Sequence, residues 1–101
     1  RPFLAGDVLA GAGAAVGEHV VCGGGVSIGA GSRVDRSVVH AEVRIGPRAL
    51  VEGSILGRGS EVGEGAVVRG SVLGEGAVVE AGAEVTDAKL RPGEHLVLGA
   101  H

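Results

Sequence analysis

The chain has 101 residues, of which 21 are glycine, one is aromatic and none is methionine. Its length fits one small domain, but a layered core normally uses several aromatic and methionine side chains to fill space. Phe3 is the sole aromatic residue, so the composition argues against such a core. A hydrophobic content of 45% excludes intrinsic disorder, and three prolines are too few for collagen.

The charge pattern and the absence of a recognisable membrane-spanning or signal segment limit which partners and which cellular compartment we expect. Nine basic and twelve acidic residues give a formal charge of −3 without a basic block, so we do not expect nucleic acid to bind. No apolar run approaches the ~18 residues of a membrane-spanning helix, and the N-terminus does not resemble a signal peptide. Cys22 is the only cysteine, which fits a reducing compartment, and we expect a cytoplasmic protein that contacts no membrane. Because it lacks methionine, the chain is expected to be a fragment, an excised domain or a processed form.

Residues 1–25 carry a weak form of a hexapeptide pattern. Leu4, Ala10, Val16 and Cys22 follow one another at steps of six residues. Ala10 is a poor core residue because its side chain buries little apolar surface. We therefore predict a weaker N-terminal coil and leading segment over this range.

Residues 26–90 contain a strong repeat. Aliphatic residues form three columns, each with a 17-residue period, and neighbouring columns are offset by five or six residues. Small or β-branched residues mostly stand two positions before each aliphatic residue, and glycine often follows it, so the unit reads small–x–aliphatic–Gly–x–x. The columns, which we predict to be the structural core, are Ile28, Ile45, Val62 and Val79; Val34, Val51, Val68 and Val85; and Val39, Leu56, Leu73 and Leu90.

Residues 91–101, with the sequence RPGEHLVLGAH, follow the last strong member of the repeat. Only Leu96 continues the spacing of six residues. We predict a C-terminal tail or an incomplete coil for this range.

The repeat unit determines the predicted fold. In an extended segment residues i−2 and i point to the same side, so each hexapeptide gives a short strand with two inward side chains. Three strands and three corners make one coil of about 17–18 residues, and the chain makes about five to six coils stacked as parallel strands. We therefore predict an all-β, single-stranded parallel β-helix, whose narrow triangular interior has no room for aromatic side chains. Glycine at the corners supplies the positive φ that sharp turns need.

Charged residues support the register of the repeat. Oppositely charged residues stand one full period apart, so stacking of successive coils brings them together, although each exposed pair contributes only about 0–1 kcal/mol. The predicted pairs are Glu52 with Arg69, Arg44 with Glu61, and Arg58 with Glu75.

The pattern resembles the left-handed parallel β-helix of hexapeptide-repeat proteins. The segments Ser54–Gly57 and Ser71–Gly74, alternating with Ile45–Val51 and Val62–Val68, are similar to the C-terminal domain of sugar-nucleotide pyrophosphorylases. They resemble especially the mannose-1-phosphate guanylyltransferases of actinobacterial type. The left hand is implied by the resemblance, since ordinary crossover rules favour the right hand.

The resemblance implies a division of labour in a longer protein. In that family an N-terminal domain joins GTP and mannose 1-phosphate to give GDP-mannose and pyrophosphate, and its carboxylates hold Mg²⁺. The present sequence contains neither its glycine-rich loop nor its carboxylate set, so no catalytic residue is carried over and no cofactor is expected in this segment. The implied role is non-catalytic: the β-helix supports the N-terminal nucleotidyltransferase domain of the same chain, drives homo-oligomerisation and in some members binds effectors.

Two alternatives remain open, a hexapeptide acyltransferase fragment and a purely structural β-helix. A coenzyme A-dependent acyltransferase would use a histidine base near a coil edge, and His40 falls at a corner, where a solvated side chain is the simpler interpretation. His19, His95 and His101 lie in weak or terminal segments and form no triad that would bind zinc. Cys22 falls in an inward column, where a small buried core residue is expected, and a nucleophile there would lack a neighbouring base.

The predicted outward positions include several aliphatic residues. A stripe of such residues along a rod would be an unusual exposed patch. We predict a contact face against the catalytic domain or another subunit, and ordinary strand propensity is the alternative explanation. The candidate interface residues are Val38, Ile55, Val72, Leu50, Val67 and Val78.

Overall fold

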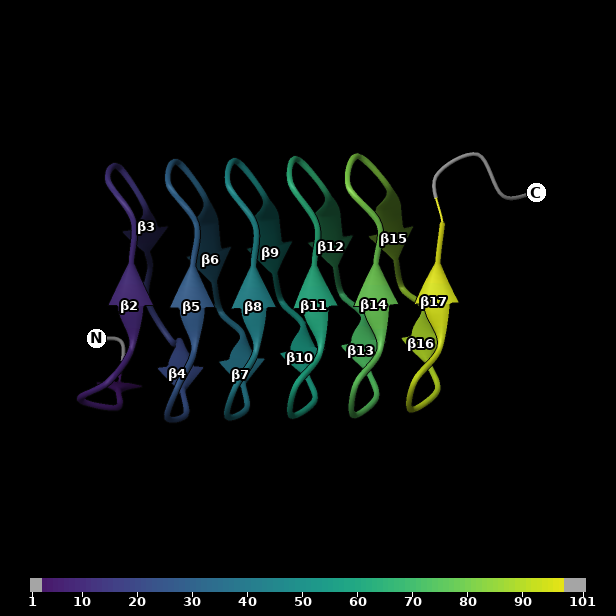
Figure 1. The fold of residues 1–101 in the computed structure, drawn as a ribbon, viewed down its shortest axis with the longest axis horizontal. Helices are drawn as coiled ribbons and strands as arrows, with labels where there is room; N and C mark the ends of the chain where they lie inside the picture. The colour runs from purple at the N-terminus through teal and green to yellow at the C-terminus, as the bar shows by residue number, and fades with distance from the viewer. Residues whose placement is uncertain (1–2, 98–101) are drawn as a thin grey trace.

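In the computed structural model, which describes residues 3–97, the chain winds through short parallel strands and three sheets (Figure 1). This range contains no helix. The chain rises along the near side in Figure 1, crosses over and descends on the far side while it advances towards the C-terminus. The winding is therefore left-handed, and the fold is the predicted left-handed parallel β-helix.

The first sheet, here called sheet A, contains one strand from each coil. The order in space follows the order in the chain, because each strand pairs with the strand one coil later. Its strands are β1 (Phe3–Leu4), β4 (Val21–Cys22), β7 (Val38–Val39), β10 (Ile55–Leu56), β13 (Val72–Leu73) and β16 (Lys89–Leu90).

The other two sheets are built in the same way. Sheet B consists of β2 (Leu9–Ala10), β5 (Ser27–Ile28), β8 (Arg44–Ile45), β11 (Glu61–Val62), β14 (Val78–Val79) and β17 (His95–Leu96). Sheet C consists of β3 (Ala15–Val16), β6 (Arg33–Asp35), β9 (Leu50–Glu52), β12 (Val67–Arg69) and β15 (Glu84–Thr86).

The interior contains the three aliphatic columns and the small residues that precede them. All twelve aliphatic residues of the columns are buried, with exposed fractions of 7% or less. The residues two positions earlier are also buried, except Ala88, which is half-buried. Alternate residues of each strand thus point inward, as the pleat of a strand requires.

Interior serines form a hydrogen-bonded ladder along one corner. The Ser54 hydroxyl donates to the carbonyl oxygen of Glu52 at 2.9 Å and accepts the N–H of Ser71 at 3.1 Å. Ser37 and Ser71 make the equivalent contacts one coil earlier and one coil later. The ladder pairs buried backbone groups at a corner where the strand hydrogen bonds stop.

Glycine serves two separate purposes at the corners. Gly65 has a φ of +69°, and nothing would lie within 4 Å of an added Cβ, so this glycine is required by its backbone conformation. A Cβ on Gly63 would lie 2.4 Å from the backbone nitrogen of Ala81 in the next coil, so this glycine is required by close approach. Positive φ, the reason expected from the sequence, therefore accounts for only part of the glycine content.

The N-terminal range 1–25 supplies β1 to β4 of the same sheets, but its inward side chains are less covered. Leu4 is 40% exposed and Ala10 is exposed. The first coil is also one residue longer than the next, as the pairing of Phe3 with Val21 and of Val21 with Val38 shows. The extra residue lies in the corner between β3 and β4.

The C-terminal range 91–101 begins with a further rung of sheet B. His95 and Leu96 form β17, which pairs with Val78 and Val79 of β14. Residues 98–101, and therefore His101, lie outside the described residues.

Candidate interface on the outer faces

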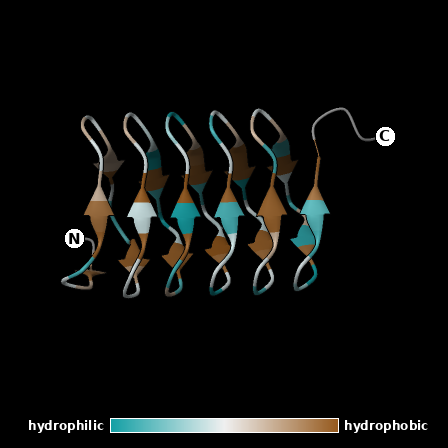
Figure 2. Cartoon of the chain, viewed as in Figure 1, coloured by the Kyte–Doolittle hydropathy of each residue, from teal (hydrophilic) through white to brown (hydrophobic). Residues whose placement is uncertain are grey.

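Sheet A carries an unbroken ladder of outward apolar side chains, here called the sheet A stripe. Its members pair in register from coil to coil and end at Lys89. Their exposed fractions run from 36% at Val72 to 68% at Phe3. Figure 2 shows the hydrophobic colour continuing along β4, β7, β10 and β13. The stripe consists of Phe3, Val21, Val38, Ile55 and Val72.

The six predicted interface residues do not share one face. Only Val38, Ile55 and Val72 belong to the sheet A stripe. Leu50 and Val67 are half-buried neighbours on sheet C, and the ladder there continues with Arg33 on one side and Glu84 on the other. Val78 is half-buried on sheet B.

Sequence reasoning missed two members of the sheet A stripe. Val21 stands one full period before Val38, so the repeat itself contained the signal. Phe3 stands one position further from Val21 than this period allows, so a strict repeat does not reach it.

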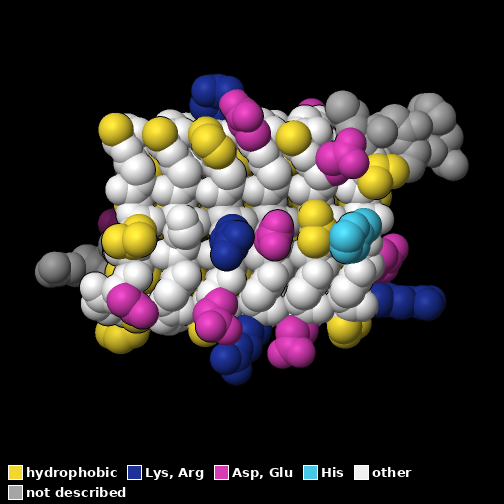
Figure 3. All heavy atoms as spheres, in the orientation of Figure 1, with side chains coloured by type: hydrophobic (Ala, Val, Ile, Leu, Met, Phe, Trp, Pro, Cys, Tyr) yellow, Lys and Arg dark blue, Asp and Glu magenta, His cyan; other side chains and the backbone are white. Residues whose placement is uncertain are grey.

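Sheet B presents a mixed surface instead. Arg44, Glu61, Val78 and His95 follow one another along its outward column, and Figure 3 shows charged and histidine side chains along this face. Arg44 and Glu61 are in register, as predicted, but they form no ion pair within 4.0 Å.

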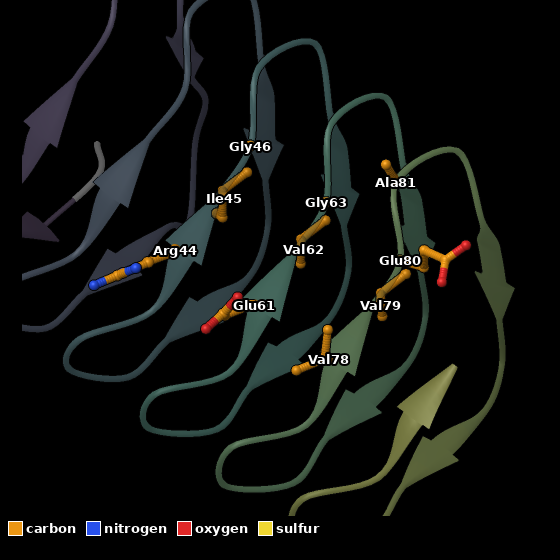
Figure 4. Close-up of a pocket in the computed structure, with 10 residues that line it drawn as sticks. All are labelled: Arg44, Ile45, Gly46, Glu61, Val62, Gly63, Val78, Val79, Glu80 and Ala81. Carbon is orange, nitrogen blue, oxygen red and sulfur yellow. The ribbon is translucent and has the colours of Figure 1, made fainter. Parts of the chain in front are cut away.

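A groove of about 290 Å³ crosses sheet B over β8, β11 and β14. Gly46 and Gly63, in the column beside the strands, are among the residues that line it. Figure 4 shows the charged side chains of Arg44, Glu61 and Glu80 pointing in different directions rather than towards one another. This arrangement does not assemble an acid, a base and a nucleophile around one point.

A second hollow of about 500 Å³ lies at the C-terminal coil. It is lined by Lys89, Arg91, Pro92, Gly93 and Glu94. The Arg91 N–H donates to the Glu94 carboxylate at 2.8 Å, so this carboxylate closes the turn that it belongs to.

The remaining candidate residues lie apart from one another. His19, His40 and His95 are all exposed, the first two at different corners and the third in β17. Cys22 is a free, buried thiol in the inward column, and burial raises the pKa of this thiol. Within residues 3–97, no three His, Cys, Asp or Glu side chains are grouped so that they could hold a metal ion.

Ion pairs join successive coils at the corners. Arg69 reaches Glu52 at 3.5 Å, as the spacing of the repeat predicts. Arg58, however, donates to Glu42 of the preceding coil at 3.0 Å rather than to Glu75 of the next. Since 62–64% of these two side chains is exposed, the bond contributes little to stability.

The fold and its outer faces define a hexapeptide-repeat β-helix without a catalytic constellation in the described residues. The chain belongs to the GMPPB C-terminal domain family, which matches residues 4–97. No curated protein matches it in sequence. Among residues 3–97, no helix is of a kind that would cross a membrane.

Several solved structures with this fold are named as transferases. The acetyltransferase domain of PglB from Neisseria gonorrhoeae is 24% identical with a TM-score of 0.69, over 96% of this chain and 51% of that one. A perosamine N-acetyltransferase variant from Caulobacter crescentus is 24% identical with a TM-score of 0.66, over 96% and 50%. A hexapeptide transferase family protein from Anaplasma phagocytophilum is 25% identical with a TM-score of 0.60, over 97% and 67%. The chain thus spans about half the length of the first two.

Proposed function

We propose that this β-helix is the non-catalytic assembly and regulatory domain of a cytoplasmic sugar-phosphate nucleotidyltransferase. In the parent protein, an N-terminal domain of the same chain joins GTP and mannose 1-phosphate to give GDP-mannose and pyrophosphate, and Mg²⁺ is held there. Membership of a family described as a C-terminal domain supports this arrangement.

The sheet A stripe is the observation that carries the assembly role. A row of exposed apolar side chains over five coils is costly to leave in water. Neighbouring faces do not share this character, since sheet B alternates charged, apolar and histidine side chains. We assign the stripe to contact with another subunit of a homo-oligomer.

The test replaces Ile55 and Val72 by lysine together. Both side chains point outward, so the fold is expected to persist, while charge in the stripe should lower the oligomer mass measured by light scattering. Ser27→Lys with Ala15→Lys is the matched control, because it adds the same charge at exposed outward positions of sheets B and C. An unchanged mass in the stripe variant would remove the assembly role.

The second candidate function is that of an acyltransferase fragment, which the solved structures with this fold favour. It predicts coenzyme A binding, and loss of acyl-transfer activity in His40→Ala because the histidine would be the general base. Titration calorimetry with coenzyme A decides between the two, because the assembly domain is expected to give no heat of binding.

A further inference from the structure

Three consecutive corners contain charged residues where the fold favours glycine. Arg36, Glu42 and Arg48 have φ values of 44°, 64° and 56°, a region that side-chain-bearing residues rarely adopt. One coil later the same corners contain glycine with positive φ. These glycines are Gly53, Gly59 and Gly65.

Each of the three charged residues forms an ion pair with the next coil. The Arg36–Glu52 pair measures 3.4 Å, and the Glu42–Arg58 pair measures 3.0 Å. Arg48 pairs with Glu64 at the third corner. The pairs lie at three different corners, so they form a ring between two coils.

The six residues of the ring alternate in charge along the chain, and the alternation continues at the next two corners with Arg69 and Glu75. We call the eight residues the corner charges. In chain order they are Arg36, Glu42, Arg48, Glu52, Arg58, Glu64, Arg69 and Glu75.

Alternation has a geometric consequence because one coil has three corners. Three is odd, so each of the corner charges from Arg36 to Arg58 is followed three corners later by one of opposite sign, although Asp35, beside Arg36, is itself in register with Glu52. If a strand stacked one corner too early or too late, two or four steps would separate the facing corners, and every pair would have like signs. Glu42 would then face Glu52 or Glu64, and Arg48 would face Arg58 or Arg69.

Apart from the serine ladder at one corner, the interior discriminates little between these arrangements. Each hexapeptide presents a small residue and an aliphatic residue to the core, so a slip by one corner exchanges Val, Ile and Leu for one another. Natural proteins often add polar features that disfavour such near-equivalent competitors.

We propose that the alternating corner charges lock the register of this β-helix, specifying three strands per coil by repelling the slipped alternatives. The ring gives Arg36, Glu42 and Arg48 a role at positions whose backbone conformation favours glycine. The lock is independent of the assembly role and would operate in the isolated chain.

Three charge variants test the lock. Arg36→Glu with Glu42→Arg and Arg48→Glu makes the native ring repulsive, and it makes the slipped contacts of these residues with Glu52, Arg58, Glu64 and Arg69 attractive. Replacement of the same three residues by glutamine removes attraction and repulsion alike. Exchange of Arg and Glu at all eight corner charges keeps the composition and restores the alternation.

Cysteine pairs report the register after refolding in a Cys22→Ala background. Val38 pairs with Ile55 in the native register, so Val38→Cys with Ile55→Cys forms a disulfide within one chain. Val38→Cys with Leu50→Cys reports a slip of one corner. The intramolecular disulfide yield of each pair is measured by mass spectrometry at low protein concentration.

The three-residue reversal is expected to raise the slipped-to-native disulfide ratio at least about tenfold, the glutamine variant less, and the eight-residue exchange not at all. An unchanged ratio in the reversal overturns the proposal. If the reversal does not refold, the eight-residue exchange decides: recovery of native cross-linking supports the lock, and failure to recover overturns it.

Discussion

At the scale of single residues, the interior serines are of two kinds. Ser54 donates one hydrogen bond and accepts another along the corner ladder. Ser60 is equally buried, but its hydroxyl has no hydrogen-bond partner. Burial of an unpaired hydroxyl is unfavourable, so the same residue type has opposite effects on stability at these two positions.

Alanine substitution should therefore separate the two serines. Ser54→Ala leaves the N–H of Ser71 without its acceptor, and we expect a loss of about 1–3 kcal/mol in the free energy of unfolding. Ser60→Ala removes only an unpaired group, and we expect a change between zero and a gain of about 1 kcal/mol. Urea denaturation of the two variants measures the difference, and equal losses would contradict it.

Glycine positions give a second comparison between residues. Gly65→Ala meets no steric contact, but alanine must adopt the left-handed backbone conformation that Gly65 already has, which costs about 1–2 kcal/mol. Gly63→Ala forces the backbone at Ala81 to move, because the added Cβ would lie 2.4 Å from its nitrogen, and we expect a loss of roughly 3 kcal/mol or more. Thermal unfolding ranks the two, and a larger loss at Gly65 would show that close approach does not restrain the coils.

At the scale of strands and coils, packing is uneven along the rod. The inward residues of the central strands, such as Leu56, Val62 and Val68, are at most 2% exposed. In the first coil Leu4 is 40% exposed and Val16 is half-buried. Since each coil contacts mainly its neighbours, local stability is expected to follow this difference.

Hydrogen exchange should reveal the gradient. We expect amides of β1 to β3 to exchange at least about tenfold faster than those of β10 to β12, because the first coil opens without disturbing the rest. Leu56→Ala, which weakens the centre, serves as the control and should reduce the difference. Uniform exchange along the chain would mean that the rod unfolds as one cooperative unit.

The sequence predicted the strands and the core because both depend on periodicity. Four successive coils each contribute one buried, inward-pointing residue to the same column, namely Ile28, Ile45, Val62 and Val79. The pairing of Arg58 with Glu42 was not predicted, since side-chain direction at an exposed corner is not set by spacing. The division of the outward residues among three faces was readable, because Val38, Leu50 and Val78 each precede a different column.

At the scale of the whole molecule, apolar and charged features occupy different places. The sheet A stripe follows one face, whereas the ion pairs lie at the corners. Salt screens exposed charges, with a screening length of about 30 Å at 0.01 M and about 3 Å at 1 M. Salt does not weaken apolar contacts, and salts that are excluded from the protein surface strengthen them.

Ionic strength should therefore distinguish the contact that holds the proposed assembly. If the sheet A stripe forms it, light scattering should give the same or a higher oligomer mass at 1 M NaCl as at 0.02 M, because burial of Ile55 and Val72 does not depend on screened charge. The Ile55→Lys and Val72→Lys variant, measured at both concentrations, shows whether the same face is responsible. Dissociation of the unmodified protein at 1 M NaCl would place the contact on charged side chains, such as those along sheet B, and would separate the apolar stripe from the assembly.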